Sequence, residues 1–420
     1  MSHEPNAREV SAVAATDRVV ELDVLRGVAL FGVLLMNIVG FARNGMMATE
    51  QQLLALPTAA IDGVLYQLLA WLVEHKAYTI FAFLFGLGFY VQWQRAITRG
   101  GDFDAIYRRR LAVLFAIGIV HTVFLWAWDI LHLYALAGFV LFALRNCRDR
   151  SLLYGGIALT MLAMPVYDLL AEWTTFTNWH GRPSPYTDEM VLARQAASES
   201  GSYPEVVRVM LELGVVDWLL SGSILAWFGW SLGRFMLGAW VGRKGWLQDA
   251  APHLPGFRRT MRIALPAGLV ICGFSRLLVV HGGAWLPEWG HWQLAGRIVN
   301  HLGTPVLALG YVCAIVVALH APLGRRLLAP FADAGRMALS NYVAQSFLIG
   351  FVLFGVGPGL ALAGRIGTTF VTAIAIVAFA AQVALSRWWL ARFRFGPLEW
   401  LWRAATYGHW PALRVAPAMR

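Results

Sequence analysis

The chain contains ten apolar runs, each about as long as a bilayer is thick. A hydrocarbon core about 30 Å thick needs about 20 mostly apolar residues in a single helix. The runs cover residues 22–42, 77–96, 109–128, 130–146, 151–171, 214–242, 262–281, 301–321, 337–356 and 367–391. Because lipid offers no partner to backbone polar groups, such runs cross membranes as helices. We predict an all-α, polytopic transmembrane helical bundle of about ten spans.

The composition excludes an ordinary soluble domain. Hydrophobic residues make up 58% of the 420 residues and charged residues only 14%, against about 25% charged in a typical soluble domain. The net charge of +10 comes from Lys and Arg placed beside the apolar runs, which favours membrane topology over nucleic-acid binding. The expected partner is the lipid bilayer, with no nucleic acid. The cysteines Cys147, Cys272 and Cys313 show no metal-ligand spacing, so we expect no metal site.

The basic residues also predict an orientation. They cluster after every even-numbered span, within residues 95–110, 145–150, 243–262, 325–336 and 387–403. Short loops rich in Lys and Arg stay in the cytoplasm. We therefore expect cytoplasmic tails at 1–21 and 406–420, membrane bundles at 22–171 and 214–405, and an extracytoplasmic loop at 172–213. That loop would form a lid or cap with some helix.

Residues 59–74 are apolar but short for a span. If they crossed the membrane, every later basic loop would change sides. We predict a short interfacial or re-entrant helix on the outer side.

The densest group of polar residues is His121, Trp126, Asp129, His132 and Tyr134, at the turn between the third and fourth spans. A histidine beside a carboxylate can form a base with an orienting partner. The same pair could instead brace a helical hairpin, and the sequence leaves both interpretations open. In either case we expect His121 and Asp129 to lie within hydrogen-bond reach, about 2.6–3.2 Å.

Other polar groups lie within or at the mouths of spans. Asp23 and Arg26 share one helical face and could bind an anionic ligand or form a helix-start ion pair. Asn341 and Gln345, at i and i+4, could contact a ligand or join helices. Lys76 would stand on the outer side, just before the second span. Residues 395–403 are typical of an interfacial segment with a structural role.

Five segments together carry a family resemblance: LDVLRGVALFGVLLMNI, KAYTIFAFLFGLGF, YRRRLAVLFAIGIVHTVFLWAWDILHLYAL, GRMALSNYVAQS and FRFGPLEWLWRAATY. They resemble the YeiB-like family of bacterial inner-membrane proteins, which is defined by a C-terminal domain of unknown function, here about residues 240–405. The resemblance implies a multi-pass protein of the bacterial inner (plasma) membrane. The residues that match its pattern are Asp23, Arg26, Gly27, Lys76, His121, Asp129, Tyr134, Asn341, Gln345, Gly396, Pro397 and Glu399. The chain departs from the pattern at Ala77 and Trp128.

The D-x-x-R-G opening is also distantly similar to transmembrane acyltransferases of the heparan-glucosaminide acetyltransferase kind. Those enzymes use a histidine to pass an acyl group from cytosolic acyl-CoA to an acceptor across the membrane. Their histidine lies in the loop after the opening helix, where this chain offers only His75.

Three functions follow as hypotheses. The first is an acyltransferase with acyl-CoA as co-substrate and no permanently bound cofactor, in which His121 and Asp129 are catalytic. Arg26 and Arg336, with Arg108–Arg110, would hold the CoA phosphates. The small-molecule substrate would contact Asp23, Arg26, Lys76, Tyr134, Asn341 and Gln345. The second is a transporter or exporter without covalent chemistry, and the third is a membrane scaffold. The sequence leaves the substrate, the acyl group and the oligomeric state open.

Overall fold

The computed structural model describes residues 19–43, 45–99, 103–173, 186–200, 202–285, 287–354 and 359–415. Most of the predicted N-terminal tail and residues 174–185 of the predicted loop lie outside these ranges. The main helices are α1 (Val20–Phe41), α2 (Glu50–Leu54), α3 (Ala59–Leu72), α4 (Lys76–Arg99), α5 (Phe103–Phe124), α6 (Leu131–Ala143), α7 (Asp149–Trp173), α8 (Asp188–Glu199), α9 (Tyr203–Gly214), α10 (Ser223–Lys244), α11 (Leu254–Trp285), α12 (Trp292–Leu319), α13 (Pro322–Leu328), α14 (Pro330–Arg336), α15 (Ala338–Phe347), α16 (Thr368–Leu390) and α17 (Pro397–Tyr407). Short π-helical segments, η5 (Val215–Leu220) and η8 (Leu348–Leu353), follow α9 and α15.

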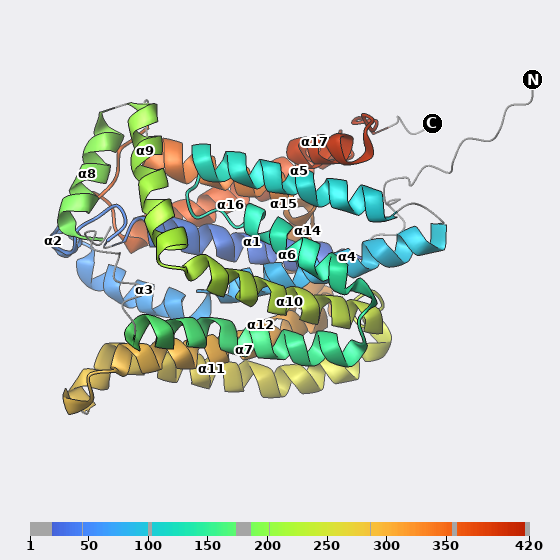
Figure 1. The fold of residues 1–420 in the computed structure, drawn as a ribbon, viewed down its shortest axis with the longest axis horizontal. Coiled ribbons are helices and arrows are strands. Elements are labelled where there is room, and N and C mark those ends of the chain that lie inside the picture. The colour runs from blue at the N-terminus through green and yellow to red at the C-terminus, as the bar shows by residue number, and fades with distance from the viewer. Residues whose placement is uncertain are drawn as a thin grey trace, which may run out of the picture.

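The long helices lie side by side and run between two ends of the bundle (Figure 1). One end carries α2, α8 and the start of α3, and we call it the cap end. The opposite end carries α17 and the last turns of α4 and α10, and we call it the arginine end. The basic clusters of the sequence fall together at the arginine end.

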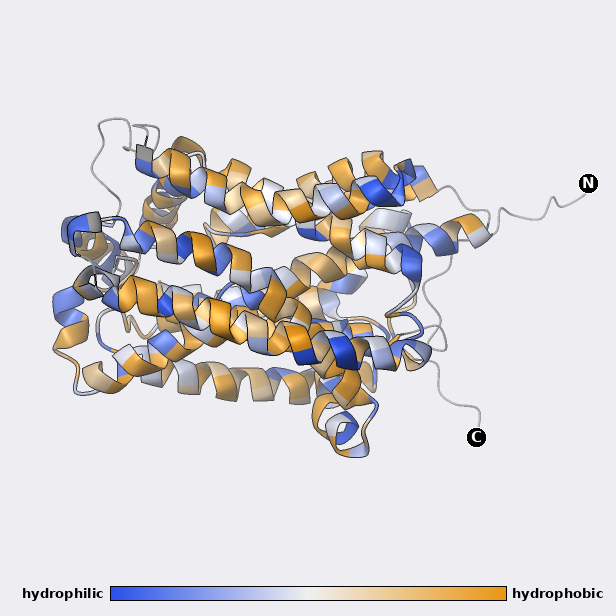
Figure 2. Ribbon diagram, turned by 90° about the horizontal axis from the view of Figure 1, so that it is seen from below, coloured by the Kyte–Doolittle hydropathy of each residue, from blue (hydrophilic) through white to orange (hydrophobic). Residues whose placement is uncertain are grey.

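The all-α prediction is confirmed, and a helix lies at each of the ten predicted spans. Within the described residues, seven helical segments are long and apolar enough to cross a membrane, and α6 and α15–η8 are shorter apolar helices. Apolar residues cover the flanks of the long helices, and polar ones gather toward the two ends (Figure 2). On α11, for example, Ile263, Val270 and Phe274 are exposed. Such surfaces are stable against lipid and unfavourable in water.

Two pairs of glycines bring helices into close contact. A Cβ atom added to Gly86 of α4 would lie 2.0 Å from a backbone oxygen of α10, and one on Gly238 of α10 would lie 1.9 Å from a backbone oxygen of α4. The same reciprocal contact joins Gly27 of α1 and Gly335 of α14, at 2.0 and 1.9 Å. Small residues allow membrane helices to approach this closely. The second contact places Arg26 and Arg336 at the same end of the bundle.

Residues 59–72 form α3. Residues 59–74 were predicted to form a short interfacial or re-entrant helix, and α3 enters the bundle instead of lying along its surface. α3 and α4 together form one continuous candidate span, Ala59–Thr98. α3 starts at the cap end and enters the bundle, where the Trp71 indole donates to the Leu269 carbonyl of α11 at 2.9 Å. The helix breaks at residues 73–75, with His75 at φ 63°, and α4 continues to the arginine end (Figure 1). α3 and α4 therefore run in succession from the cap end to the arginine end as one broken helix.

The predicted structural role of residues 395–403 has a physical basis in Glu399. Its carboxylate accepts hydrogen bonds from the backbone N–H groups of Leu339 and Ser340, at 2.7 and 3.1 Å, and from the Ser340 hydroxyl at 2.5 Å. These groups stand at the start of α15, where backbone donors lack helical partners. Gly396 lets the carboxylate approach, since an added Cβ would lie 2.1 Å from it. α17 is thereby attached to α15.

Within the described part of the predicted loop, α8 and α9 cover the cap end. Arg194 of α8 is buried and donates to the backbone oxygens of Gly45 and Met46, each at 2.8 Å. The Tyr203 hydroxyl at the start of α9 donates to the Phe124 carbonyl at 2.6 Å. The loop thus packs onto the ends of α1 and α5, as expected of a cap.

The predicted orientation can be tested by single-cysteine labelling in intact cells. Glu189 at the cap end and Trp410 at the arginine end are both exposed. Glu189→Cys should react with a membrane-impermeant maleimide, and Trp410→Cys should react only after permeabilisation. The opposite pattern would place the arginine end outside the cell.

Candidate functional site

The site is a cavity of about 380 Å³ that extends from the arginine end into the bundle. Its walls come from α1, α4, α5, α6, α14, α15 and α17. Six arginines line it: Arg26, Arg95, Arg110, Arg336, Arg394 and Arg403. Among the described residues that line it, Asp23 and Glu399 are the only carboxylates. The cavity mouth is therefore strongly cationic.

Carboxylates of the described residues neutralise only part of this positive charge, so the rest can bind a ligand. Arg26 pairs with Asp23 at 2.9 Å, and Arg336 pairs with Asp333 at 3.3 Å. Among the described residues, no carboxylate forms an ion pair with Arg110, Arg394 or Arg403. Guanidinium groups form strong, often bidentate hydrogen bonds with phosphate and carboxylate. The mouth can therefore bind an anionic group.

Two features reinforce this charge. The Glu399 carboxylate is already bound to the start of α15, and burial raises its pKa above the usual range. The guanidinium of Arg110 lies 3.6 Å above the Trp402 ring, a cation–π contact that holds it in place.

The deep part of the cavity is mainly apolar. Leu30, Val33, Leu114, Ile130 and Leu131 line it. The hydroxyl-bearing side chains there are Tyr78, Tyr134 and Tyr342. A cationic mouth and an apolar interior suit an amphipathic ligand with an anionic head.

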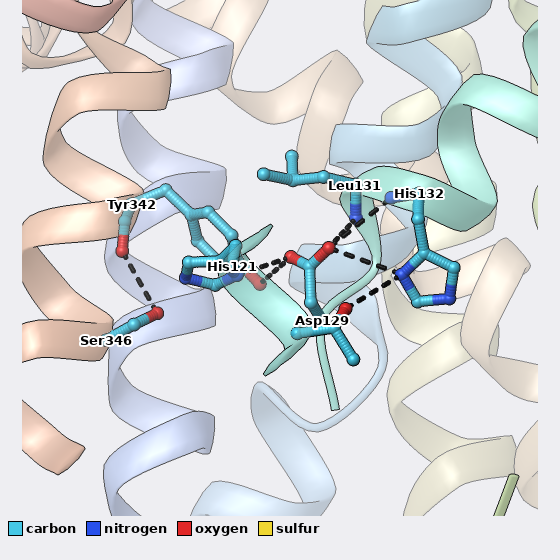
Figure 3. A network of polar contacts seen from close by, with 7 residues as sticks. His121, Asp129, Leu131, His132, Tyr342 and Ser346 are labelled. Atoms are coloured by element: carbon cyan, nitrogen blue, oxygen red, sulfur yellow. Dashed lines mark hydrogen bonds and ion pairs between the residues drawn. The ribbon is translucent and has the colours of Figure 1, made fainter. Parts of the chain in front are cut away.

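Asp129, next to this deep end, collects several hydrogen bonds (Figure 3). Its Oδ1 lies 2.8 Å from His121 Nδ1 and accepts from the Tyr342 hydroxyl at 3.2 Å. Its Oδ2 accepts from the backbone N–H groups of Leu131 and His132, at 2.8 and 3.3 Å. The hydrogen bond predicted between His121 and Asp129 is confirmed. Asp129 also binds the start of α6, where backbone donors would otherwise be unpaired.

Because α6 is short, Asp129, just before its start, and His121 lie inside the protein and not at one end of the bundle. Its 13 residues span about 20 Å, less than a bilayer core of about 30 Å. α9 and η5 fill the remaining space, and Trp128 donates from its indole to Asp217 of η5 at 2.8 Å. Asp129 and His121 are consequently only 0% and 2% exposed.

The geometry leaves one histidine nitrogen available. With Nδ1–H donating to Asp129, Nε2 of His121 carries the lone pair, because the carboxylate fixes the tautomer of the ring. Nε2 is buried and has no hydrogen-bond partner among the described residues. His121 is not on the cavity wall; Tyr342 lies between, with its ring centroid 5.2 Å from that of His121.

Five of the residues predicted as ligand-binding line the cavity: Asp23, Arg26, Arg110, Tyr134 and Arg336. Asn341 instead donates to the Ser386 hydroxyl of α16 at 3.0 Å. Gln345 donates to Gln382 of α16 at 2.9 Å. These two amides therefore join α15 to α16, which agrees with the interhelical interpretation.

Lys76 lies away from both the cavity and the outer surface. It is 1% exposed, and its neighbour Ala77 packs against Gly32, near the middle of α1. Its Nζ donates to the Ala70 carbonyl of α3 at 3.2 Å and to Asn300 of α12 at 3.5 Å. The expectation of an outer-side lysine is corrected. A charge at mid-bilayer costs about 2.5–3.5 kcal/mol on insertion scales, so we expect a buried lysine at this depth to have a function.

Sequence reasoning missed Tyr342, Arg394 and Arg403 as site residues. Tyr342 could have been noticed, because it follows Asn341 directly in GRMALSNYVAQS. The two arginines come from the segment around α17, which the hydrogen bonds of Glu399 to α15 and of Trp402 to the Arg110 carbonyl bring to the cavity mouth.

Comparisons with known proteins agree with the resemblance. Residues 241–409 match the family described as "Protein of unknown function (DUF418)". The YxaH protein of Bacillus subtilis (strain 168) is 31% identical over 408 residues, covering 94% of this chain and 95% of YxaH. The chain belongs to the YeiB-like family. YeiB of Escherichia coli (strain K12) is 28% identical over 401 residues, covering 93% of this chain and 96% of YeiB.

A third relative, a 39.9 kDa protein of Bacillus acidopullulyticus, is 28% identical over 401 residues. All three relatives are described as uncharacterized. Membership of the YeiB-like family therefore supports a helical membrane protein, and the function has to be argued from the site.

Removing the Asp129 carboxylate should destabilise the protein far more than removing the Tyr342 hydroxyl. Asp129→Ala leaves the buried donors of His121, Leu131 and His132 unpaired, which should cost about 3–5 kcal/mol. Tyr342→Phe removes one hydrogen bond, worth about 0.5–1.5 kcal/mol. Thermal unfolding of detergent-purified variants checks this order. Equal losses of stability would contradict the central role given to Asp129.

Proposed function

We propose that the chain is a membrane acyltransferase that binds acyl-CoA at the arginine end and passes the acyl group to a hydroxyl or amine acceptor. The observation that carries the proposal is the cavity itself. One continuous space has six arginines at its mouth and Tyr342, hydrogen-bonded to Asp129, at its deep end. An acyl-CoA has phosphates at one end and an acyl thioester at the other, in the same order.

The chemical step requires a base near the thioester. In the proposed step the Tyr342 ring, which separates His121 from the cavity, turns aside. His121 Nε2 then takes the proton of the acceptor while the acceptor oxygen or nitrogen attacks the thioester carbon. The bond between that carbon and sulfur then breaks, and the proton passes from the imidazolium to the CoA thiolate. Asp129 stabilises the imidazolium formed in between, as the carboxylate does in a Ser-His-Asp triad. Tyr342 lies between the ligand and this pair and would orient the acyl end.

Binding of acyl-CoA to the purified chain tests the donor site. Arg26→Gln and Arg403→Gln should each weaken binding about tenfold to 100-fold, because a charge-assisted hydrogen bond contributes about 1.5–3 kcal/mol. His121→Asn should leave binding unchanged and abolish release of free CoA thiol in the presence of acceptor. Calorimetric titration with acetyl-, octanoyl- and palmitoyl-CoA, at low and high salt, gives the affinities.

Arg392→Gln is the matched control. Arg392 is also near the arginine end, but it does not line the cavity, and it donates to the Trp388 carbonyl at 3.0 Å. Its replacement should not change the affinity. If millimolar concentrations of all three acyl-CoAs fail to bind, the donor site is wrong.

Transport is the second candidate function, and the broken α3–α4 crossing favours it. Helices broken near mid-membrane often surround the binding sites of transporters, and Lys76 lies at this break. Uptake or export of an amphipathic anion that requires Arg26 but survives His121→Asn would favour transport over acyl transfer.

A further inference from the structure

A second group of titratable residues lies on the other side of the bundle from the arginine-lined cavity. It begins at the cap end with Glu172 of α7 and His291, whose Oε1 and Nδ1 lie 3.3 Å apart. Both side chains are partly exposed, at 35% and 47%. This group takes no part in the acyl transfer proposed above.

The group continues inward between α7 and α12. Asp168 and Glu172 are four residues apart on α7, and Arg297 and His301 are four apart on α12, so each pair shares a helix face. Asp168 Oδ2 lies 3.2 Å from His301 Nε2, and Asp168 Oδ1 lies 3.5 Å from Arg297 Nε. The exposed fraction falls inward, from 44% for Arg297 to 13% for Asp168 and His301.

From His301 the group reaches the break between α3 and α4. The rings of His301 and His75 have centroids 6.0 Å apart, and in the path argued below a water molecule would carry the proton between them. His75 Nδ1 is buried without a hydrogen-bond partner among the described residues. The next residue is Lys76, whose ammonium binds the Ala70 carbonyl in the last turn of α3, and Asn300 beside His301 also contacts it.

The surroundings of Lys76 contain few other ionisable groups. Glu74 lies at the break, Cys272 and Arg276 face it from α11, and Arg234 of α10 lies near His75. Within the described residues, Lys76 has no ion pair with a carboxylate. A buried ammonium held by neutral oxygens can therefore change its charge without breaking an ion pair.

We propose that Glu172, Asp168, His301 and His75 form a proton path from the cap end to Lys76. Carboxylates, imidazoles and an amine can each hold and release a proton, and Asp–His chains serve as proton relays in membrane proteins. Arg297 stays protonated and keeps Asp168 and Glu172 in position. Through this path Lys76, at the helix break, gains or loses a proton. This step does not depend on the reaction that occurs in the cavity.

Proton entry along this path moves charge across part of the membrane. Oriented membrane vesicles on a solid-supported electrode should give a transient current when the pH changes on the cap-end side. Lys76→Met should abolish the displaced charge, because the final acceptor is gone. His301→Gln and Asp168→Asn should keep the total charge but slow the transient about 100-fold, the typical contribution of one positioned proton-transfer group.

His281→Gln is the matched control. His281 is an exposed histidine on α11 whose ring contacts Trp285 and not a residue of the path, and its replacement should leave the current unchanged. A role of His301 and Asp168 in merely bracing α7 against α12 predicts that the isosteric Asp168→Asn lowers the unfolding temperature and leaves the current as in the wild type. That result, or a wild type without any transient, would overturn the proposal. Because the current is measured without acyl-CoA, failure here leaves the acyltransferase proposal to its own test.

Discussion

A carboxylate buried far from water must obtain its hydrogen bonds from the protein, and Asp129 holds together the region where the candidate site forms. Its two oxygens accept from His121, Tyr342 and the first turn of α6. α5, α6 and α15 are thereby joined at one point inside the bundle. The deep end of the cavity is built on the same helices, so its shape depends on this carboxylate.

The cavity mouth depends on a second carboxylate in the same way. Glu399 of α17 binds the start of α15, while glycine contacts hold α14 against α1. These two attachments bring arginines from distant parts of the chain around one opening. The repulsion among them is reduced by ion pairs at Arg26 and Arg336 and by the contact of Arg110 with Trp402. An anionic ligand would offset the remainder.

The molecule thus holds two polar systems in an apolar bundle, and they approach from opposite ends. The cavity enters from the arginine end and stops near Asp129. The titratable residues of α7 and α12 enter from the cap end and stop at Lys76. Tyr78, two residues after Lys76, lines the cavity, so the broken helix touches both systems. A change at the break can therefore alter the cavity directly.

The sequence by itself determined the all-α class and the positions of the spans, because bilayer thickness and backbone hydrogen bonding act on each segment separately. It also predicted that His121 lies close to Asp129, because only a short segment separates the end of α5 from Asp129. Only the tertiary structure placed Lys76 inside the bundle, since the depth of a residue at a helix break depends on the neighbouring helices. The tertiary structure also decides that Asn341 and Gln345 contact α16 and that Tyr342 and Arg403 line the cavity. A hydrophobic pattern shows that a helix is buried, but the partner of each polar side chain is set by packing between segments far apart in the chain.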